Sequence, residues 1–410
     1  SQNIIISQGS GANVTIAPGD AKAVYLDGAG SGAAVVDAFA GLNIGTTSGG
    51  ATVNGITSKT FGTSSIMIGD TTTGTIDAAN YNTGVGVDVF AALTTGDSNL
   101  AVGYQALNAN TTGSFNTALG ENSLLLNTTG GTNTAVGSRS LDENTTGGSN
   151  TAVGQGALNK NTTASNNTGI GQGALADNTT GDVNTAVGVS ALGNNTTASN
   201  NSAVGREALF TNTTGASNTA MGNASLYYNT TAANNSAFGY QALFNNTTGA
   251  YNTGVGYKVL FDNTTGTRNV ALGDSALENN TTANDNTAFG SAALYLNTTG
   301  TQNTAVGAAA LDANTTADNN VAVGFNVLTA NTTGAGNTAV GKSAMYTNTT
   351  GGGNTAIGIE ALGVNTTANY NTAIGLSAMA ANTTGTRNTA AGASALAANT
   401  TANDNTAFGY

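Results

Sequence analysis

The chain has 410 residues, with 58 glycines, one proline, and no cysteine, histidine or tryptophan. Only 7% of the residues are charged, and the formal net charge is -12. The nine basic residues form no patch that could neutralise phosphates, so we expect no binding to nucleic acid. The absence of cysteine excludes disulfides. No apolar run reaches the roughly 18–20 residues that a membrane span needs.

Residues 1–64 are expected to form a small β module. Ala33–Leu42 fits either a short helix or a buried strand, and Pro18–Asp20 predicts a turn. This module is expected to cap the repeats that follow, because the end of a stack of coils exposes unpaired backbone groups that can pair with another chain. The other expected role is to attach the repeats to a larger particle. Apolar runs predict its strands at Asn3–Ile6, Val14–Ile16 and Ala23–Leu26.

Residues 65–81 predict a transition, or a degenerate first coil. The stretch Ser65–Gly69 reads SIMIG and lies one repeat length ahead of Asn82, where a regular repeat begins. We therefore expect the repeat architecture to begin one unit before the first regular copy.

Residues 82–410 repeat one 17-residue unit, N-T-A-V-G-x-x-A-L-x-x-N-T-T-G/A-x-x, without an insertion or a deletion. Its first Asn, called position 1, recurs from Asn82 to Asn405, which gives 20 copies. A solenoid coil has a fixed perimeter, so a constant unit length predicts stacked coils. Asn-Thr-Thr followed by Gly or Ala, which recurs every 17 residues, is unfavourable for a helix. The sequence therefore predicts an all-β fold, a parallel β-solenoid of 17-residue coils.

Positions 2 to 4 of each unit alternate as a strand does, and position 3 is only Ala or Gly. We expect positions 4 and 9 to supply the bulky core residues, and position 3, on the opposite face, to be pressed against another backbone. The invariant Gly at position 5 predicts a corner with positive φ or without room for a Cβ. The residues expected to carry this structure are Ala135, Val136, Gly137, Leu141, Asn144, Ala152, Val153, Gly154, Leu158, Ala203, Gly205 and Leu209.

The scarcity of charge follows from stacking. Equivalent residues of adjacent coils lie about 4.7–4.9 Å apart, so a charged repeat position would form a column of like charges. Neutral Asn and Thr are expected to form hydrogen-bonded ladders instead. Two bulky residues per coil make a thin core, and we expect chains to associate along the small-residue face as a homotrimer.

The unit at Asn133–Gly137, with the return segment at Ala157-Leu158, resembles the head repeat of YadA-like trimeric autotransporter adhesins. In those proteins an S-V-A-I-G strand and a small-residue return build a left-handed parallel β-roll. The array also resembles those of tail-fibre and other structural proteins of marine bacteriophages. The resemblance covers residues 82–410 and implies a left-handed, trimeric, surface-displayed fibre.

Catalytic chemistry has little support in the sequence. Without His or Cys, the usual nucleophile and base pairs are absent. Gly336–Ser343 matches a phosphate-loop pattern, but it lies in the repeat register and no helix is expected after it. The glycine- and aspartate-rich calcium repeat is missing. We therefore expect no enzyme activity, no metal site and no cofactor.

Aromatic residues at the variable positions 6, 7, 10, 11, 16 and 17 are the best binding candidates. They fit either stacking on sugars, such as host surface glycans, or packing between chains. They include Tyr104, Phe210, Tyr227, Tyr228, Tyr240, Tyr257, Tyr295 and Tyr346.

The sequence thus predicts a structural fibre that projects from a virion, as a tail fibre or capsid-associated fibre, and supports host attachment. The N-terminal module would be its anchor. The alternative is a bacterial cell-surface adhesin or extracellular filament subunit. The first hypothesis places the protein on a virion, and the alternative places it outside the cell or on the cell surface.

Overall fold

The computed structural model describes residues 78–410 without a gap and, before them, seven separate strands. Within these residues all regular secondary structure is β, and there is no helix that could cross a membrane. The early strands are β1 (Ile4–Ile6), β2 (Val14–Ile16), β3 (Val24–Leu26), β4 (Val35–Asp37), β5 (Ala51–Val53), β6 (Ile56–Phe61) and β7 (Ser65–Gly69).

The first four strands form two antiparallel pairs, β1 with β2 and β3 with β4. The three strands expected near the N-terminus are confirmed as β1, β2 and β3. Of the two readings of Ala33–Leu42, the strand is found, as β4. The turn expected at Pro18–Asp20 lies outside the described residues.

Strands β5, β6 and β7 pair in antiparallel order, and β7 then pairs in parallel with β8 (Thr83–Gly86). In that pairing Ile66 faces Thr83, which is the register of the repeats that follow. The SIMIG stretch therefore has the strand position of a regular coil. The antiparallel strands β5 and β6 continue the sheet beyond it.

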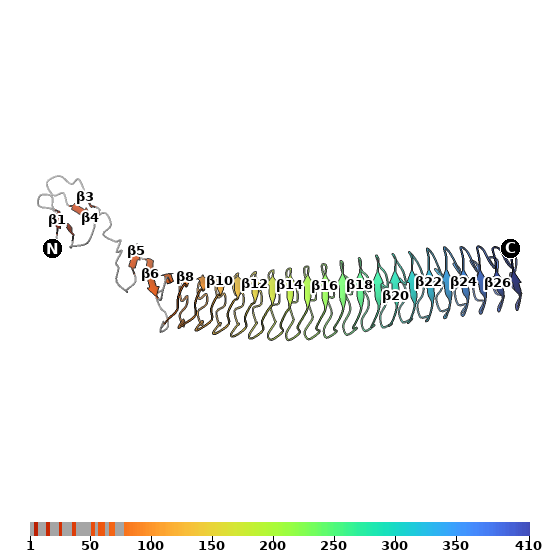
Figure 1. The fold of residues 1–410 in the computed structure, drawn as a ribbon, viewed down its shortest axis with the longest axis horizontal. Coiled ribbons are helices and arrows are strands. Elements are labelled where there is room, and N and C mark those ends of the chain that lie inside the picture. The colour runs from red at the N-terminus through yellow and green to blue at the C-terminus, as the bar shows by residue number, and fades with distance from the viewer. Residues whose placement is uncertain are drawn as a thin grey trace.

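From β8 onward the chain is a parallel β-solenoid, drawn as a row of equal coils in Figure 1. Each strand pairs with the equivalent strand of the next unit, as Thr117 does with Thr134. The fold class predicted from the repeat is confirmed. The strands are β9 (Leu100–Val102), β10 (Thr117–Leu119), β11 (Thr134–Val136), β12 (Thr151–Val153), β13 (Thr168–Ile170), β14 (Thr185–Val187), β15 (Ser202–Val204), β16 (Thr219–Met221), β17 (Ser236–Phe238), β18 (Thr253–Val255), β19 (Val270–Leu272), β20 (Thr287–Phe289), β21 (Thr304–Val306), β22 (Val321–Val323), β23 (Thr338–Val340), β24 (Thr355–Ile357), β25 (Thr372–Ile374), β26 (Thr389–Ala391) and β27 (Thr406–Phe408).

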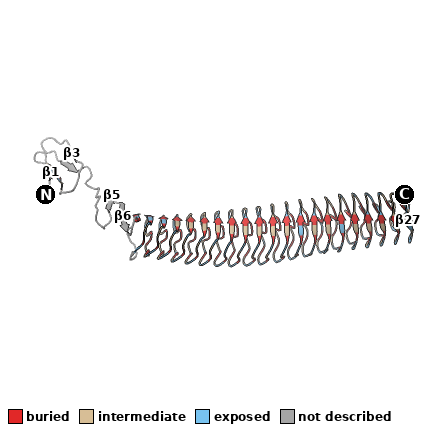
Figure 2. Cartoon of the chain, in the orientation of Figure 1, coloured by how far each residue is buried: buried red, intermediate tan, exposed pale blue. Residues whose placement is uncertain are grey.

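The core lies inside each coil and consists mainly of positions 3, 8 and 9. Figure 2 shows in red that buried residues recur on successive strands along the rod. Ala203 at position 3 and Leu209 at position 9 are fully buried. At Gly169, a position-3 glycine, a Cβ would lie 3.4 Å from Cγ of Leu158 in the preceding coil. Position 3 is small because the strand and the return segment lie so close together.

This arrangement corrects two sequence expectations. Position 4 does not supply the core: Ile170 is 40% exposed and Leu272 is 47% exposed. Position 3 is buried within its own chain, so it cannot be the face along which chains associate. The strand alternates as predicted, but its inner and outer faces are the reverse of those predicted.

Both reasons expected for the Gly at position 5 are found, a positive φ and a lack of space for a Cβ. Gly205 has φ +131°, and a Cβ there would lie 2.5 Å from the carbonyl oxygen of Gly222 in the next coil. Leu158 at position 9 also has a positive φ, of 52°. Its N–H donates to the carbonyl of Ala174 at 2.9 Å, so the left-handed conformation, which costs about 1–2 kcal/mol, keeps the coils hydrogen-bonded to each other.

Two buried columns of Asn form the expected ladders. At position 12, Nδ2 of Asn144 donates to Oδ1 of Asn127 at 2.7 Å and to the carbonyl of Gly147 at 3.0 Å. At position 1, Nδ2 of Asn150 donates to the carbonyl of Ala164 at 2.8 Å, which closes its own coil. Each amide thus satisfies buried polar groups of its own coil and of a neighbouring one.

Candidate functional site

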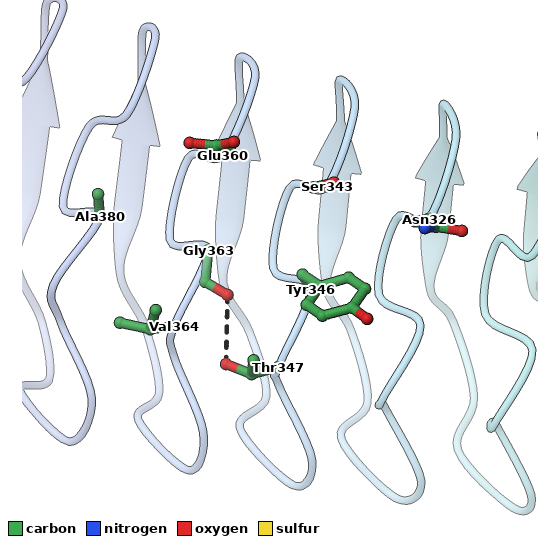
Figure 3. A pocket seen from close by; sticks show the side chains of 8 residues that line it. All are labelled: Asn326, Ser343, Tyr346, Thr347, Glu360, Gly363, Val364 and Ala380. Atoms are coloured by element: carbon green, nitrogen blue, oxygen red, sulfur yellow. Dashed lines mark hydrogen bonds between the residues drawn. The ribbon is translucent and has the colours of Figure 1, made fainter.

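The solenoid has two outward surfaces of different character. We call positions 2 and 4 the strand face, and positions 6, 7, 10 and 11 the return edge. In Figure 3 the labelled return-edge residues lie on the segments in front of the strands. The core lies between the two surfaces, because position 3 of the strand packs against position 9 of the return segment.

The strand face is uniform and carries no charge. Position 2 is Thr in 15 of the 20 units and otherwise Ser, Leu or Val, and position 4 is an apolar residue in all of them. Between Thr83 and Thr406 the structure shows no hydrogen bond within the chain for any position-2 hydroxyl. The face is therefore a long column of half-exposed apolar side chains beside a column of available hydroxyl groups.

The return edge varies from coil to coil, and in four consecutive coils position 10 is aromatic. Phe210, Tyr227, Phe244 and Phe261 form an aromatic ladder, with ring centroids 5.4, 5.3 and 5.2 Å apart along the series. The planes of the last two rings differ by only 2°. Ring-on-ring packing is thus the natural arrangement for aromatic residues one coil apart in this column.

Neighbouring columns extend the aromatic cluster. Tyr228 at position 11 packs edge-on against Tyr227 at 4.7 Å. At position 6, Tyr240 and Tyr257 stack at 5.5 Å, and the Lys258 ammonium lies 5.6 Å from the Tyr257 ring centroid. Much of the ring surface in this region is therefore already in contact with other rings or with a cation.

A hollow of about 390 Å³ opens on the return edge beside Tyr346, as Figure 3 shows. Tyr346 occupies position 10, and the next two coils have Gly363 and Ala380 there. The floor is held in place by Thr347, whose hydroxyl donates to the carbonyl of Gly363 at 3.2 Å. The full lining consists of Asn326, Ser343, Tyr346, Thr347, Glu360, Gly363, Val364 and Ala380.

Two further hollows lie on the same side of the solenoid. One, of about 730 Å³, runs between Tyr228, Asp262 and the Thr residues of position 13, such as Thr247. The other, of about 330 Å³, lies beside Arg139 and Gln155. The second hollow lies where Gly156 and Gly173 follow Arg139 at position 7 in successive coils, so residues at the variable positions contribute to the relief of this surface.

Charged groups on the solenoid mostly pair between adjacent coils or are partly buried. Arg268 and Asp285, which occupy the same position in successive coils, form an ion pair at 2.6 Å, and the hydrogen bond from the guanidinium lowers the pKa of that carboxyl. Burial instead raises the pKa of Asp312, at position 10, whose Oδ1 has no hydrogen-bond partner. Burial also raises the pKa of Asp142 in the same column.

The residues singled out from the sequence are distributed over both surfaces and the core. Of the twelve structural residues, the Ala, Leu and Asn side chains are buried, whereas Val136 and Val153 point outward on the strand face. Tyr104 and Tyr295 have no ring contact within 78–410, unlike the aromatic ladder. In the phosphate-loop match, residues 338–340 form strand β23, and Ser343 lines the hollow beside Tyr346.

The hollow itself does not follow from the aromatic residues taken one at a time. The signal was present: reading position 10 down successive units shows Tyr346 followed by Gly363 and Ala380. Among the described residues there is no group of three or more acidic side chains placed to hold a metal ion. In comparisons with known proteins, no protein-family model matches the chain, and no curated protein matches it significantly in sequence.

Proposed function

We propose that this protein is a non-catalytic structural fibre that projects from a virion and supports attachment to a host. The observation that carries the proposal is the unbroken parallel register from β7 to β27, in which every coil repeats the contacts of the one before. Twenty coils at about 4.8 Å each give a rod about 95 Å long. Such a rod holds whatever lies at its two ends at a fixed distance, and the N-terminal module is the proposed anchor.

The proposed assembly is a homotrimer that associates through the strand face. That face has no charged residue at position 2 or 4 of any unit. A strip about 95 Å long and about 10 Å wide has an area of about 950 Å². Each chain of a trimer would share this strip between its two neighbours, about 475 Å² with each, so the three strips together would bury about 2,850 Å². The apolar column would be buried between chains, and the free hydroxyl groups of position 2 would bond across the interface.

The assembly is tested by sedimentation equilibrium on the wild type and on Ile170→Lys combined with Val187→Lys. The wild type is expected at three times the 39.9 kDa chain mass, and the double variant at the chain mass with an unchanged circular dichroism spectrum. Gln155→Lys combined with Gln172→Lys adds the same charge to the return edge and is expected to stay trimeric. A wild-type monomer would overturn the proposed assembly.

The location is tested with antibodies raised against residues 82–410. Gold-labelled antibody is expected to bind thin projections on purified virions in electron micrographs. Labelling confined to the surface of bacterial cells would contradict the virion proposal and favour an adhesin.

A further inference from the structure

We propose that the hollow beside Tyr346 binds a neutral pyranose ring of a carbohydrate chain, which stacks on the Tyr346 side chain. This site goes beyond the fibre role and does not depend on it. The hollow lies on the return edge, across the core from the strand face, so the surface is open in a monomer and in a trimer alike.

The aromatic ladder shows what the geometry of position 10 accepts. In coils one step apart, the rings of Phe244 and Phe261 pack on each other with centroids 5.2 Å apart. Tyr346 begins the same pattern, but Gly363 follows it one coil later and provides no ring. A flat ring about as large as a side-chain ring can therefore lie against Tyr346 over the backbone of Gly363.

The size and the lining of the hollow suit a small ring with hydroxyl groups. Its volume of about 390 Å³ lies within the roughly 300–1,000 Å³ that is usual for ligand pockets. The Tyr346 ring, 45% exposed, offers an apolar surface to the C–H groups of a pyranose. Asn326, Ser343 and Glu360, all at position 7, provide polar groups along one side.

The charge of the site selects among sugars. Glu360 is the one charged residue that lines the hollow. A carboxylate accepts hydrogen bonds from sugar hydroxyls and is stronger in that role than a neutral acceptor. It also repels a carboxylate or phosphate on the ligand. We therefore assign the site to neutral sugars rather than to uronic acids or phosphorylated sugars.

The fixed floor favours a preformed site. The Thr347 hydroxyl donates to the carbonyls of Gly363 and Asn365, at 3.2 and 3.1 Å, and so holds two adjacent coils together beneath the hollow. By contrast, the larger hollow beside Tyr228 adjoins rings that already pack against Tyr228 and against each other. Of the three hollows, only the one beside Tyr346 pairs an aromatic ring with two small residues in the coils that follow it in the same column.

The test is saturation-transfer NMR and titration of the full chain with methyl glycosides. The neutral probes are methyl glucoside, methyl galactoside and methyl mannoside. Methyl glucuronide, the negatively charged counterpart of methyl glucoside, is the control for charge. A single sugar on one ring is expected to bind in the millimolar range, with transfer strongest at the C–H protons of one face. At least one neutral glycoside is expected to bind tenfold or more tightly than the glucuronide.

Two variants locate the site. Tyr346→Ala removes the stacking surface and is expected to weaken binding at least tenfold. Gly363→Phe places a ring where the aromatic ladder has one and is expected to abolish binding while the circular dichroism spectrum stays unchanged. The controls are Tyr370→Ala, an exposed tyrosine at position 17, and Ala176→Phe at position 10 of a distant coil; both are expected to bind as the wild type does.

Several outcomes would overturn the proposal. They are no transfer to any neutral glycoside, equal binding of the glucuronide, and binding that survives both Tyr346→Ala and Gly363→Phe. Binding of p-cresol or indole in place of every glycoside would also overturn it, because the occupant would then be an aromatic side chain of a protein. The molecular mass of the protein assembly is measured separately by sedimentation equilibrium, so failure of sugar binding leaves the test of the trimer unaffected.

Discussion

The strand face and the return edge are built by the same repeat unit, yet they differ in what they allow. On the strand face every unit places a small hydroxyl or apolar residue at position 2 and an apolar residue at position 4. On the return edge the same column can hold Phe244 in one coil and Gly363 in another. Both surfaces are supported by the same buried Ala, Leu and Asn columns, so the difference does not come from the core.

The difference indicates what kind of partner each surface can have. A surface that repeats at every coil suits a partner with the same period, and a second copy of the chain is such a partner. A surface that varies can place a particular group at one height along the rod. If the interior and the strand face are constant and the return edge is variable, substitutions in the three places should differ in their effects.

The largest effect is expected at the corner between the strand face and the return edge. Gly205→Ala places a Cβ against the backbone of Gly222 and forces Ala to a φ of +131°. We expect a loss of about 4 kcal/mol in the free energy of unfolding, from steric overlap and backbone strain together. Urea denaturation measures it. Gly156→Ala is the control: φ there is +64°, nothing lies within 4 Å of the added Cβ, and the loss should be about 1 kcal/mol.

The assignment of inner and outer faces is tested by one substitution on each side of β15. Ala203→Leu overfills the interior and is expected to lower the free energy of unfolding by about 3 kcal/mol. Val204→Leu enlarges a side chain on the exposed strand face and should change it by less than about 0.5 kcal/mol in the monomer. Equal losses, measured by urea denaturation in a background that does not associate, would contradict the assignment.

The buried Asn ladder should matter more than Asn on the return edge. Asn144→Ala removes the bonds to Asn127 and Gly147, and it leaves Asn161 with one of its two acceptors, the carbonyl of Ala164. We expect a loss of about 2 kcal/mol. Asn159→Ala removes an exposed bond to the carbonyl of Arg139 and is expected to cost under about 0.5 kcal/mol. Hydrogen exchange of the adjacent coils should increase only for Asn144→Ala.

The smallest effect concerns pH. Burial raises the pKa of Asp312 in the folded chain, so its contribution to stability is present below the unfolded value of 3.8 and is lost as pH rises through the folded value. Asp312→Asn should therefore stabilise the protein slightly at neutral pH, and not at a pH below 3.8.

Asp285 provides the opposite case. Arg268 lowers its pKa, so its contribution is present above 3.8 and is lost as pH falls through the folded value. Asp285→Asn should slightly destabilise the protein at neutral pH, as expected for an exposed pair. Thermal melts of the wild type and of each variant at several pH values measure how the contributions of Asp312 and Asp285 to stability change with pH. If both contributions changed with pH in the same direction, one of the two pKa shifts would be wrong.

Much of the fold could be predicted from the repeat alone. The unit length established the solenoid, the invariant Gly predicted the positive φ at position 5, and Asn and Thr predicted ladders. What could not be predicted was which strand face is inside. Alternation places Ala203 and Val204 on opposite sides, but hydrophobicity favours burying the Val, and only the short distance between strand and return segment reverses that choice.

The candidate site was less predictable for a related reason. A hollow is defined by a missing side chain, and Gly363 has no property of its own that indicates binding. Its meaning depends on Tyr346 one coil earlier and on Phe244 and Phe261 elsewhere in the same column. The positive φ of Leu158 was equally hidden, because it follows from hydrogen bonding between coils and not from any preference of leucine.

The constant register of the coils has a consequence for the inheritance of length. Because Thr117 pairs with Thr134 as Thr134 pairs with Thr151, excision of any whole unit brings together two edges that already fit. A recombination event between two of the near-identical repeats would shorten or lengthen the rod by about 4.8 Å per unit, without changing the backbone pairing between adjacent coils. Natural selection can therefore adjust the reach of this protein in fixed steps, independently of its ends.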